Sequence, residues 1–200
     1  IKPGVSERQV AAKIGYLLKV KGCDKESFDT IAVSGKNAAL PHGQPGPKLL
    51  VTGDMVTMDY GGFYRGYAGD MTRTVAVGET SERLIGYYHA VLEAQQIGVA
   101  MVKAGVCCRE IDQSVRNCLK KYDLECYFQH GTGHGVGLEI HEEPRVSFTS
   151  DRVLTANMVI TIEPGIYIPG WGGIRIEDTV IVKNGGCEII THSDKSLLIL

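Results

Sequence analysis

The sequence has no apolar run long enough to cross a bilayer. Charged residues or glycines interrupt each hydrophobic stretch well before the roughly 18 residues that a membrane-spanning helix needs. The first residues, Ile1 to Gly4, also lack the basic segment, apolar core and cleavage site of a secretory signal peptide. We therefore expect no membrane partner. Because the chain does not start with methionine, we expect a processed chain or an excised domain.

A basic surface is also missing. The 200 residues contain 21 lysines and arginines against 23 aspartates and glutamates, which gives a formal net charge of -2. No cluster of lysine or arginine along the chain overrides this balance. Domains that bind nucleic acid carry a basic patch or stripe. We therefore expect no nucleic acid partner.

The six cysteines do not form the pattern of a disulfide framework. None of them belongs to a C-x-x-C pair, and a chain of 200 residues with 44% hydrophobic residues can bury a core without disulfides. We expect reduced thiols that mainly fill the core. Together with the missing signal peptide, this favours a cytoplasmic location. The length favours one catalytic or binding domain over residues 1–200.

Hydrophobic periodicity predicts a mixed chain. A capping box at Ser6 and Gln9 starts an amphipathic helix that Gly22 ends, and two further helices follow Ser81, with Gly105 between them. Short β-branched runs predict strands, namely residues 28–33, 55–60, 72–77, 159–162, 174–176 and 179–182. A glycine- and proline-rich loop spans residues 34–47. This order predicts an α+β domain in which helices cover one face of a curved, largely antiparallel sheet.

Four acidic residues interrupt or end these apolar strands. They are Asp59, Asp70, Glu163 and Glu177. An ionised carboxylate that is buried without a partner costs several kcal/mol, so each needs a salt bridge, a proton or a cation. For Asp59 and Asp70 alone, a structural salt bridge and a metal are equally good interpretations. Four such acids with few nearby bases favour a metal site.

The segment from His130 to His141 holds three histidines within twelve residues, and glycines surround them. Taken singly, each is better interpreted as a hydrogen-bonded structural residue than as a ligand. For His134, the four carboxylates on strands reverse this preference, and a metal ligand becomes the better interpretation. By contrast, His89 and His192 have no such neighbours in the sequence, and we expect solvated or structural positions for both.

At these residues the chain resembles the pita-bread metallopeptidases, the family of methionine aminopeptidases, Xaa-Pro aminopeptidases and prolidases. The resemblance covers essentially the whole chain. Asp59 and Asp70 are eleven positions apart as in the family, and His134 sits in its His-Gly-x-Gly-His-Gly setting. Glu163 and Glu177 lie in Thr-Ile-Glu-Pro-Gly and Arg-Ile-Glu-Asp. The resemblance implies the pita-bread (creatinase/aminopeptidase) fold.

The resemblance also implies two divalent metal ions. Asp59 would bind one ion and His134 and Glu163 the other, with Asp70 and Glu177 as bridges. Two such ions share a hydroxide and clamp the oxygens of a tetrahedral intermediate. Carboxylates with one imidazole suit manganese, which we expect first, and also cobalt, iron or zinc.

Further residues match family positions that face the substrate. By resemblance, His141 donates a hydrogen bond to the scissile carbonyl oxygen, His42 contacts the substrate near the scissile amide, and His130 lines the pocket for the residue after the cut. Glu163 would also carry the proton to the leaving nitrogen. We expect Arg175 to bind substrate. Arg145 or Arg152 would suit a dipeptide's carboxylate, although solvated surface positions are the expectation for both.

The motifs resemble the Xaa-Pro branch of the family most closely. Thr-Ile-Glu-Pro-Gly-Ile-Tyr, Gly-Ile-Arg-Ile-Glu-Asp and Ala-Leu-Pro-His carry this likeness. It implies an exopeptidase that cleaves between an N-terminal residue and proline, either an Xaa-Pro aminopeptidase or an Xaa-Pro dipeptidase. The alternatives are a methionine aminopeptidase and an inactive module that binds peptides or proteins. Xaa-Pro enzymes usually carry an additional N-terminal domain, to which no segment here corresponds, and a homodimer is among the expectations.

Overall fold

The computed structural model describes residues 1–200 and contains three α-helices, two short 3-10 helices and thirteen strands. The helices are α1 (Glu7–Val20), α2 (Glu82–Met101), α3 (Cys108–Lys120), η1 (Gly35–Ala39) and η2 (Glu125–Tyr127). Strands of the first half are β1 (Lys25–Glu26), β2 (Ile31–Ser34), β3 (Met55–Tyr60), β4 (Gly62–Tyr64), β5 (Tyr67–Ala68) and β6 (Met71–Ala76). Strands of the second half are β7 (Gly133–Gly135), β8 (Glu142–Val146), β9 (Val159–Ile162), β10 (Gly165–Ile168), β11 (Gly172–Arg175), β12 (Asp178–Lys183) and β13 (Gly186–Ile189). None of the helices combines the length and the apolarity needed to cross a membrane.

The start of α1 follows directly from its sequence. The Ser6 hydroxyl accepts a hydrogen bond from the Gln9 amide, and the Gln9 side chain accepts one from the Ser6 amide. These two bonds satisfy donors that a helix N-terminus otherwise leaves free. The predicted capping box is therefore confirmed. Val10 on the buried side of the helix packs against β2, β3 and β6.

The strands form four small sheets in which all pairs of named strands are antiparallel. The largest has the order β13-β12-β9-β7-β8, and the next has the order β2-β3-β6. Two smaller sheets, β1-β4-β5 and β10-β11, complete the set. The predicted α+β class with a largely antiparallel sheet is confirmed.

Threonine side chains of β6 join the β2-β3-β6 sheet to β11 and to the residues that follow it, along a line that we call the seam. Thr74 on β6 donates through its hydroxyl to the Arg175 carbonyl at 2.8 Å and accepts from the Arg175 amide at 3.2 Å. One step along, the Glu177 amide donates to the Thr72 carbonyl at 3.1 Å. The seam therefore places the residues that follow β11 directly beside β6.

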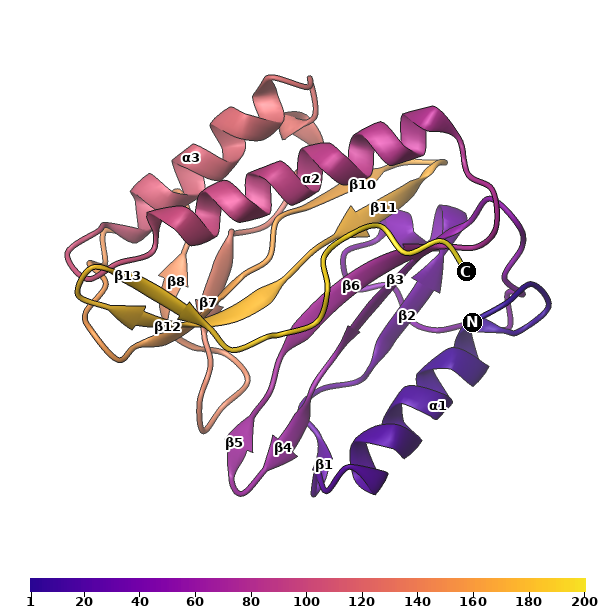
Figure 1. Ribbon diagram of the computed structural model, residues 1–200, viewed down its shortest axis with the longest axis horizontal. Helices are drawn as coiled ribbons and strands as arrows, with labels where there is room; N and C mark the ends of the chain where they lie inside the picture. The colour runs from indigo at the N-terminus through magenta and orange to yellow at the C-terminus, as the bar shows by residue number, and fades with distance from the viewer.

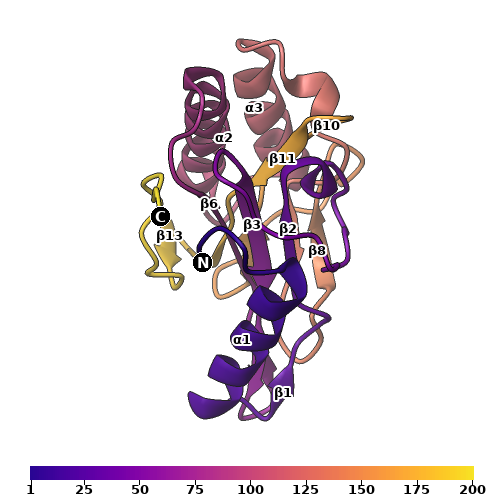
Figure 2. The same ribbon diagram turned by 90° about the vertical axis from the view of Figure 1, so that its right-hand side faces the viewer.

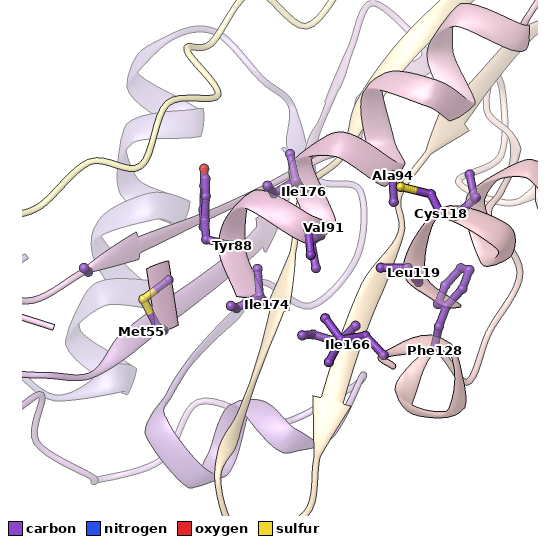
Figure 3. Packing of buried hydrophobic residues seen from close by; sticks show 14 residues of the cluster. Met55, Tyr88, Val91, Ala94, Cys118, Leu119, Phe128, Ile166, Ile174 and Ile176 are labelled. Atoms are coloured by element: carbon purple, nitrogen blue, oxygen red, sulfur yellow. The ribbon is translucent and has the colours of Figure 1, made fainter. Parts of the chain in front are cut away.

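Helices α2 and α3 lie side by side over β10 and β11, while α1 packs beside β2 (Figures 1 and 2). Figure 3 shows the core beneath α2 and α3, where Tyr88, Val91 and Leu119 share one buried cluster with Ile174 and Ile176. Because strand side chains alternate between faces, Arg175 and Glu177 point away from the helices. Burial of the isoleucines thus fixes which face receives the charged residues.

Some elements differ from the sequence prediction. The predicted strand 28–33 begins only at Ile31, and the predicted loop 34–47 contains η1. The strand β10 directly after Glu163 was not predicted, because the Pro-Gly that follows Glu163 reads as a turn. In the structure β10 instead pairs with β11 as a hairpin.

A substitution at Gly133 tests the close packing of β7 against β9. A Cβ at this position would lie 1.9 Å from the Thr161 carbonyl oxygen, so Gly133→Ala forces the two strands apart. We expect it to lower the free energy of unfolding by about 2 kcal/mol or more, measured by urea denaturation. The matched control is Gly86→Ala on α2, where a Cβ meets no atom within 4 Å. We expect Gly86→Ala to raise the free energy of unfolding by up to about 1 kcal/mol. Equal stability of the two variants would contradict the close packing of β7 against β9.

Candidate metal centre

A cavity of about 850 Å³ opens where the two larger sheets meet. Only 3 of its 22 lining residues are hydrophobic, which suits a charged or polar ligand better than an apolar one. Every site residue predicted from the sequence lines it: His42, Asp59, Asp70, His130, His134, His141, Glu163, Arg175 and Glu177. The structure thus brings together residues that are up to 135 positions apart, from His42 to Glu177.

Strand ends deliver the acidic side chains to the cavity. Asp59 lies in β3 opposite Thr72 of β6, and Asp70 directly precedes β6. Glu163 follows β9, whose Ile160 and Ile162 are buried beneath the helices. Period-two alternation then turns Glu163 to the opposite face, toward the cavity.

His134 has a defined orientation in β7. Its Nδ1 lies 2.9 Å from the Gly135 carbonyl oxygen, which can only accept, so Nδ1 carries a proton. In the neutral ring, Nε2 then presents a lone pair. This atom lies 3.4 Å from Asp70 Oδ2 and 3.4 Å from Glu163 Oε1. A lone pair that faces two carboxylates calls for a proton or a metal cation between them.

Two carboxylate oxygens in the cavity are buried without a hydrogen-bond partner, namely Asp59 Oδ1 and Glu177 Oε1. The second oxygen of each group is engaged, because Arg175 donates to Asp59 Oδ2 at 2.5 Å and Thr72 to Glu177 Oε2 at 2.7 Å. Buried polar atoms are rarely left unsatisfied, and metal coordination is a normal reason for it. Ligand atoms of Asp70, His134 and Glu177 also lie within 4.8 Å of one another. The donor set therefore fits a divalent cation.

The pKa values of these groups reflect the free-energy cost of burying several ionisable side chains close together. Burial raises the pKa of Glu163 to about 7, and burial also raises the pKa of Asp70 and of Glu177. Burial alone would lower the pKa of His134, but the hydrogen bond that its ring donates to Asp70 and the charge of Glu163 raise it to about 9. The cluster therefore holds protons in the absence of other cations.

Arg175 is only 3% exposed, and all its nitrogens donate to protein atoms. Nε donates to the Thr72 hydroxyl, Nη1 to the Pro41 carbonyl and the Tyr167 hydroxyl, and Nη2 to Asp59. We predicted a substrate contact for Arg175 from the sequence. This geometry instead favours a role in holding Asp59 and the loop that contains Pro41.

The other histidines occupy different parts of the cavity. His130 bonds through Nδ1 to the Gly131 carbonyl and through Nε2 to the Tyr167 hydroxyl, both at 2.8 Å, and burial lowers its pKa to about 4. The ring of His141 lies 4.4 Å from that of His134, between centroids, and burial lowers its pKa. His42 is exposed at the rim. All three rings thus surround the acidic cluster.

Comparison with known proteins shows the family of the chain. Residues 1–184 match the model of metallopeptidase family M24. The chain belongs to this family. It is 48% identical over 198 residues to the Xaa-Pro dipeptidase of Pyrococcus furiosus, a match that covers 99% of this chain and 57% of the relative. The chain thus spans a little over half the length of the curated relatives that it matches.

Solved structures of M24 relatives share its fold. The chain superposes on the Xaa-Pro dipeptidase from Bacillus anthracis with a TM-score of 0.98 and 50% identity, covering 100% of this chain and 56% of that one. For the X-Pro aminopeptidase from Thermotoga maritima the TM-score is 0.97 at 40% identity, with 100% and 57% covered. The predicted pita-bread fold is confirmed by these likenesses.

Two residues that hold the lining of this cavity in place were not identified from the sequence. Tyr167 is buried and connects His130 with Arg175 through its hydroxyl. Asp112 on α3 is fully buried and accepts from the Thr132 amide and hydroxyl at the start of the histidine loop. The sequence holds one signal for Asp112, because Arg116 follows it at the i, i+4 spacing of an ion pair on a helix. In the structure Arg116 also donates to the His130 carbonyl.

The raised pKa of Glu177 predicts a gain in stability when its charge is removed. A carboxyl whose pKa is higher in the folded than in the unfolded chain destabilises the fold once ionised, so the cost is present at pH 8 and absent near pH 4. In chelator at pH 8, Glu177→Gln should raise the melting temperature by roughly 3 °C or more. Added manganese should then stabilise the native sequence but not the variant.

The control for this measurement is Glu79→Gln, because Glu79 is exposed and lies outside the cavity. This change should leave both the melting temperature and the response to manganese as they are. If Glu177→Gln melted lower in chelator and still gained stability from manganese, Glu177 would not be a strained ligand.

Proposed function

We propose that this chain is a dinuclear-metal-dependent exopeptidase that hydrolyses the bond between an N-terminal residue and proline. The observation that carries the proposal is the meeting of Asp59, Asp70, His134, Glu163 and Glu177 around one polar cavity. Two of their buried oxygens lack a protein partner. The Xaa-Pro names of several relatives support the choice of substrate.

The ligand set divides naturally between two ions. His134 Nε2 lies equally close to Asp70 and Glu163, which supports one ion held by His134 and Glu163. Asp59 on β3 would hold the second ion, and both ions would share Asp70 and Glu177. When bound, the ions make a water more acidic and polarise the scissile carbonyl. Manganese is our first choice, with cobalt, zinc or iron as alternatives.

Protein side chains supply the proton transfers and the substrate contacts. Glu163, with a pKa raised to about 7, suits a group that accepts a proton near neutral pH and delivers it to the leaving nitrogen. His141 would donate a hydrogen bond to the carbonyl oxygen as negative charge develops there. His42 would contact the substrate near the scissile amide, and His130 would line the pocket for the proline ring.

The cavity also offers a partner for a dipeptide's carboxylate. Arg145 lies on β8 opposite His134 and lines the cavity, whereas Arg152 lies near Glu143 at the surface. An exposed guanidinium can bind a carboxylate with two parallel hydrogen bonds. This favours the dipeptidase over the aminopeptidase within the Xaa-Pro branch. A homodimer and a cytoplasmic location stay predictions.

Activity assays with defined peptides test the proposal. With manganese or cobalt added, we expect kcat/KM for Xaa-Pro dipeptides to exceed that for Met-Ala peptides by at least about tenfold, and chelation to abolish hydrolysis. His141→Ala should lower kcat about 100-fold or more, because it removes a donor to the developing oxyanion. His89→Ala on the exposed side of α2 is the matched control and should change nothing.

Two results would overturn this assignment. Faster release of methionine from Met-Ala peptides would make the chain a methionine aminopeptidase. Absence of bound divalent ions after loading, together with absence of hydrolysis, would make it a peptide-binding module.

A further inference from the structure

Glu7 is a buried carboxylate that lies outside the cavity lining and has no part in the proposed reaction. Glu7, in the first turn of α1, has an exposed fraction of 0%. Its Oε1 accepts from the Ser34 amide at 2.8 Å, the Ser34 hydroxyl at 3.0 Å and the Asn37 side chain at 3.2 Å. Its Oε2 accepts from Asn37 at 3.1 Å and from the Gly46 amide at 3.1 Å. One side chain thus binds both ends of the segment 34–46.

The backbone of α1 adds to this closure. The Glu7 amide donates to the Lys48 carbonyl at 3.0 Å, and the Arg8 amide donates to the Gly46 carbonyl at 3.1 Å. Amides in the first turn of a helix have no partner within the helix, so the end of the segment satisfies them. Gly46 is therefore held to α1 through both its N–H and its C=O.

The opposite side of the same segment packs against the metal-site strands. A Cβ at Gly173 of β11 would lie 2.0 Å from the Ala38 carbonyl oxygen, so the two backbones touch. The Pro41 carbonyl accepts from Arg175, the residue that also binds Asp59. Directly after Pro41, the segment carries His42 to the rim of the cavity.

Stability alone is a weak reason to bury a carboxylate. Replacing buried ionic groups by well-packed apolar residues is often neutral or stabilising, whereas several directed hydrogen bonds fix one loop conformation. Lys48 reinforces the arrangement, because its ammonium donates to the Ser34 hydroxyl at 2.8 Å and pairs with Asp54 at 2.6 Å. The hydrogen bonds around Glu7 and Ser34 therefore fix the point at which the loop closes.

We propose that Glu7 is a positioning residue that places His42 in the substrate cavity by closing the loop 34–46. The inference rests on the proposed function for its kinetic consequence, since His42 acts there on the substrate. Glu7 itself touches neither substrate nor metal ligands. It acts through Ser34, Asn37 and Gly46.

A double-mutant cycle between Glu7 and His42 tests the proposal. Glu7→Gln keeps the shape of the side chain, but its amide group turns a donor toward the donors of Asn37 or Gly46. With His42 present, we expect kcat/KM for an Xaa-Pro dipeptide to fall about tenfold. In the His42→Ala background the same change should cost less than about twofold. Equal losses in both backgrounds would overturn the proposal.

Glu82→Gln is the matched control. Glu82 occupies the same first helical position in α2, after the cap Ser81, and its side chain is exposed. Its replacement removes the same charge from a helix N-terminus and should leave kcat/KM unchanged in both backgrounds. A loss equal to that of Glu7→Gln would trace the effect to the helix charge and overturn the positioning role.

A second readout does not depend on catalysis. Histidine ring signals in NMR spectra are assigned through His42→Ala, and Glu7→Gln should shift and broaden the His42 signal while the His89 and His192 signals stay in place. Unchanged His42 signals would contradict the proposal even in an active enzyme. If no variant or native protein hydrolyses peptides, the proposed function fails, and the NMR result still decides the role of Glu7.

Asn37→Ala provides a second variant where Glu7→Gln does not fold. It removes the side chain from the loop side of the cluster and leaves Glu7 bonded to Ser34 and Gly46. We expect the same coupling to His42 and the same displaced ring signal, at a smaller amplitude. No coupling and an unmoved signal would overturn the proposal here as well.

Discussion

Four largely buried carboxylates that share one cavity are the constraint on which this structure depends. Desolvation and mutual repulsion disfavour their ionised forms, and the raised pKa values of Asp70, Glu163 and Glu177 express that cost. Arg175 pairs directly with Asp59 alone among these acids, and its charge lowers the pKa of Asp70 and Glu163 without offsetting their desolvation. Asp70 and Glu163 instead lie 3.4 Å from Nε2 of His134. Divalent cations would resolve the imbalance, and the fold is arranged to receive them.

Keeping such groups together requires a rigid frame behind them. Arg73 on β6 donates to the carbonyls of Thr72 and Glu177 and pairs with Asp178, which also pairs with Lys195. These bonds lock β6 to the start of β12 on the face away from the cavity. On the face toward the cavity, the hydroxyls of Thr72 and Thr74 hold β6 to Glu177 and Arg175. The spacing between Asp70 and Glu177 is thereby set from both sides, as a shared metal site demands.

Local patterns predicted much of the framework. The short β-branched runs at residues 55–60 and 159–162 gave β3 and β9 with their observed ends, and the capping box gave the start of α1. All nine predicted site residues line one cavity: eight lie in short motifs near strand ends or in the segment from His130 to His141, and His42 lies in the loop 34–46. The partners of buried charges could not be predicted this way. The bonds from Arg175 to Asp59 and from Ser34 and Gly46 to Glu7 join residues far apart in sequence, and only tertiary packing brings them into contact.

The most direct test of the central claim is anomalous diffraction from a crystal soaked in manganese. The account predicts two peaks in the cavity, roughly 3.5–4 Å apart, with carboxylates of Asp70 and Glu177 between them. Asp59 should lie at one peak, and His134 and Glu163 at the other. A cavity without peaks, or a single peak with Asp70 and Glu177 turned away from it, would contradict the assignment of these acids to a dinuclear metal centre.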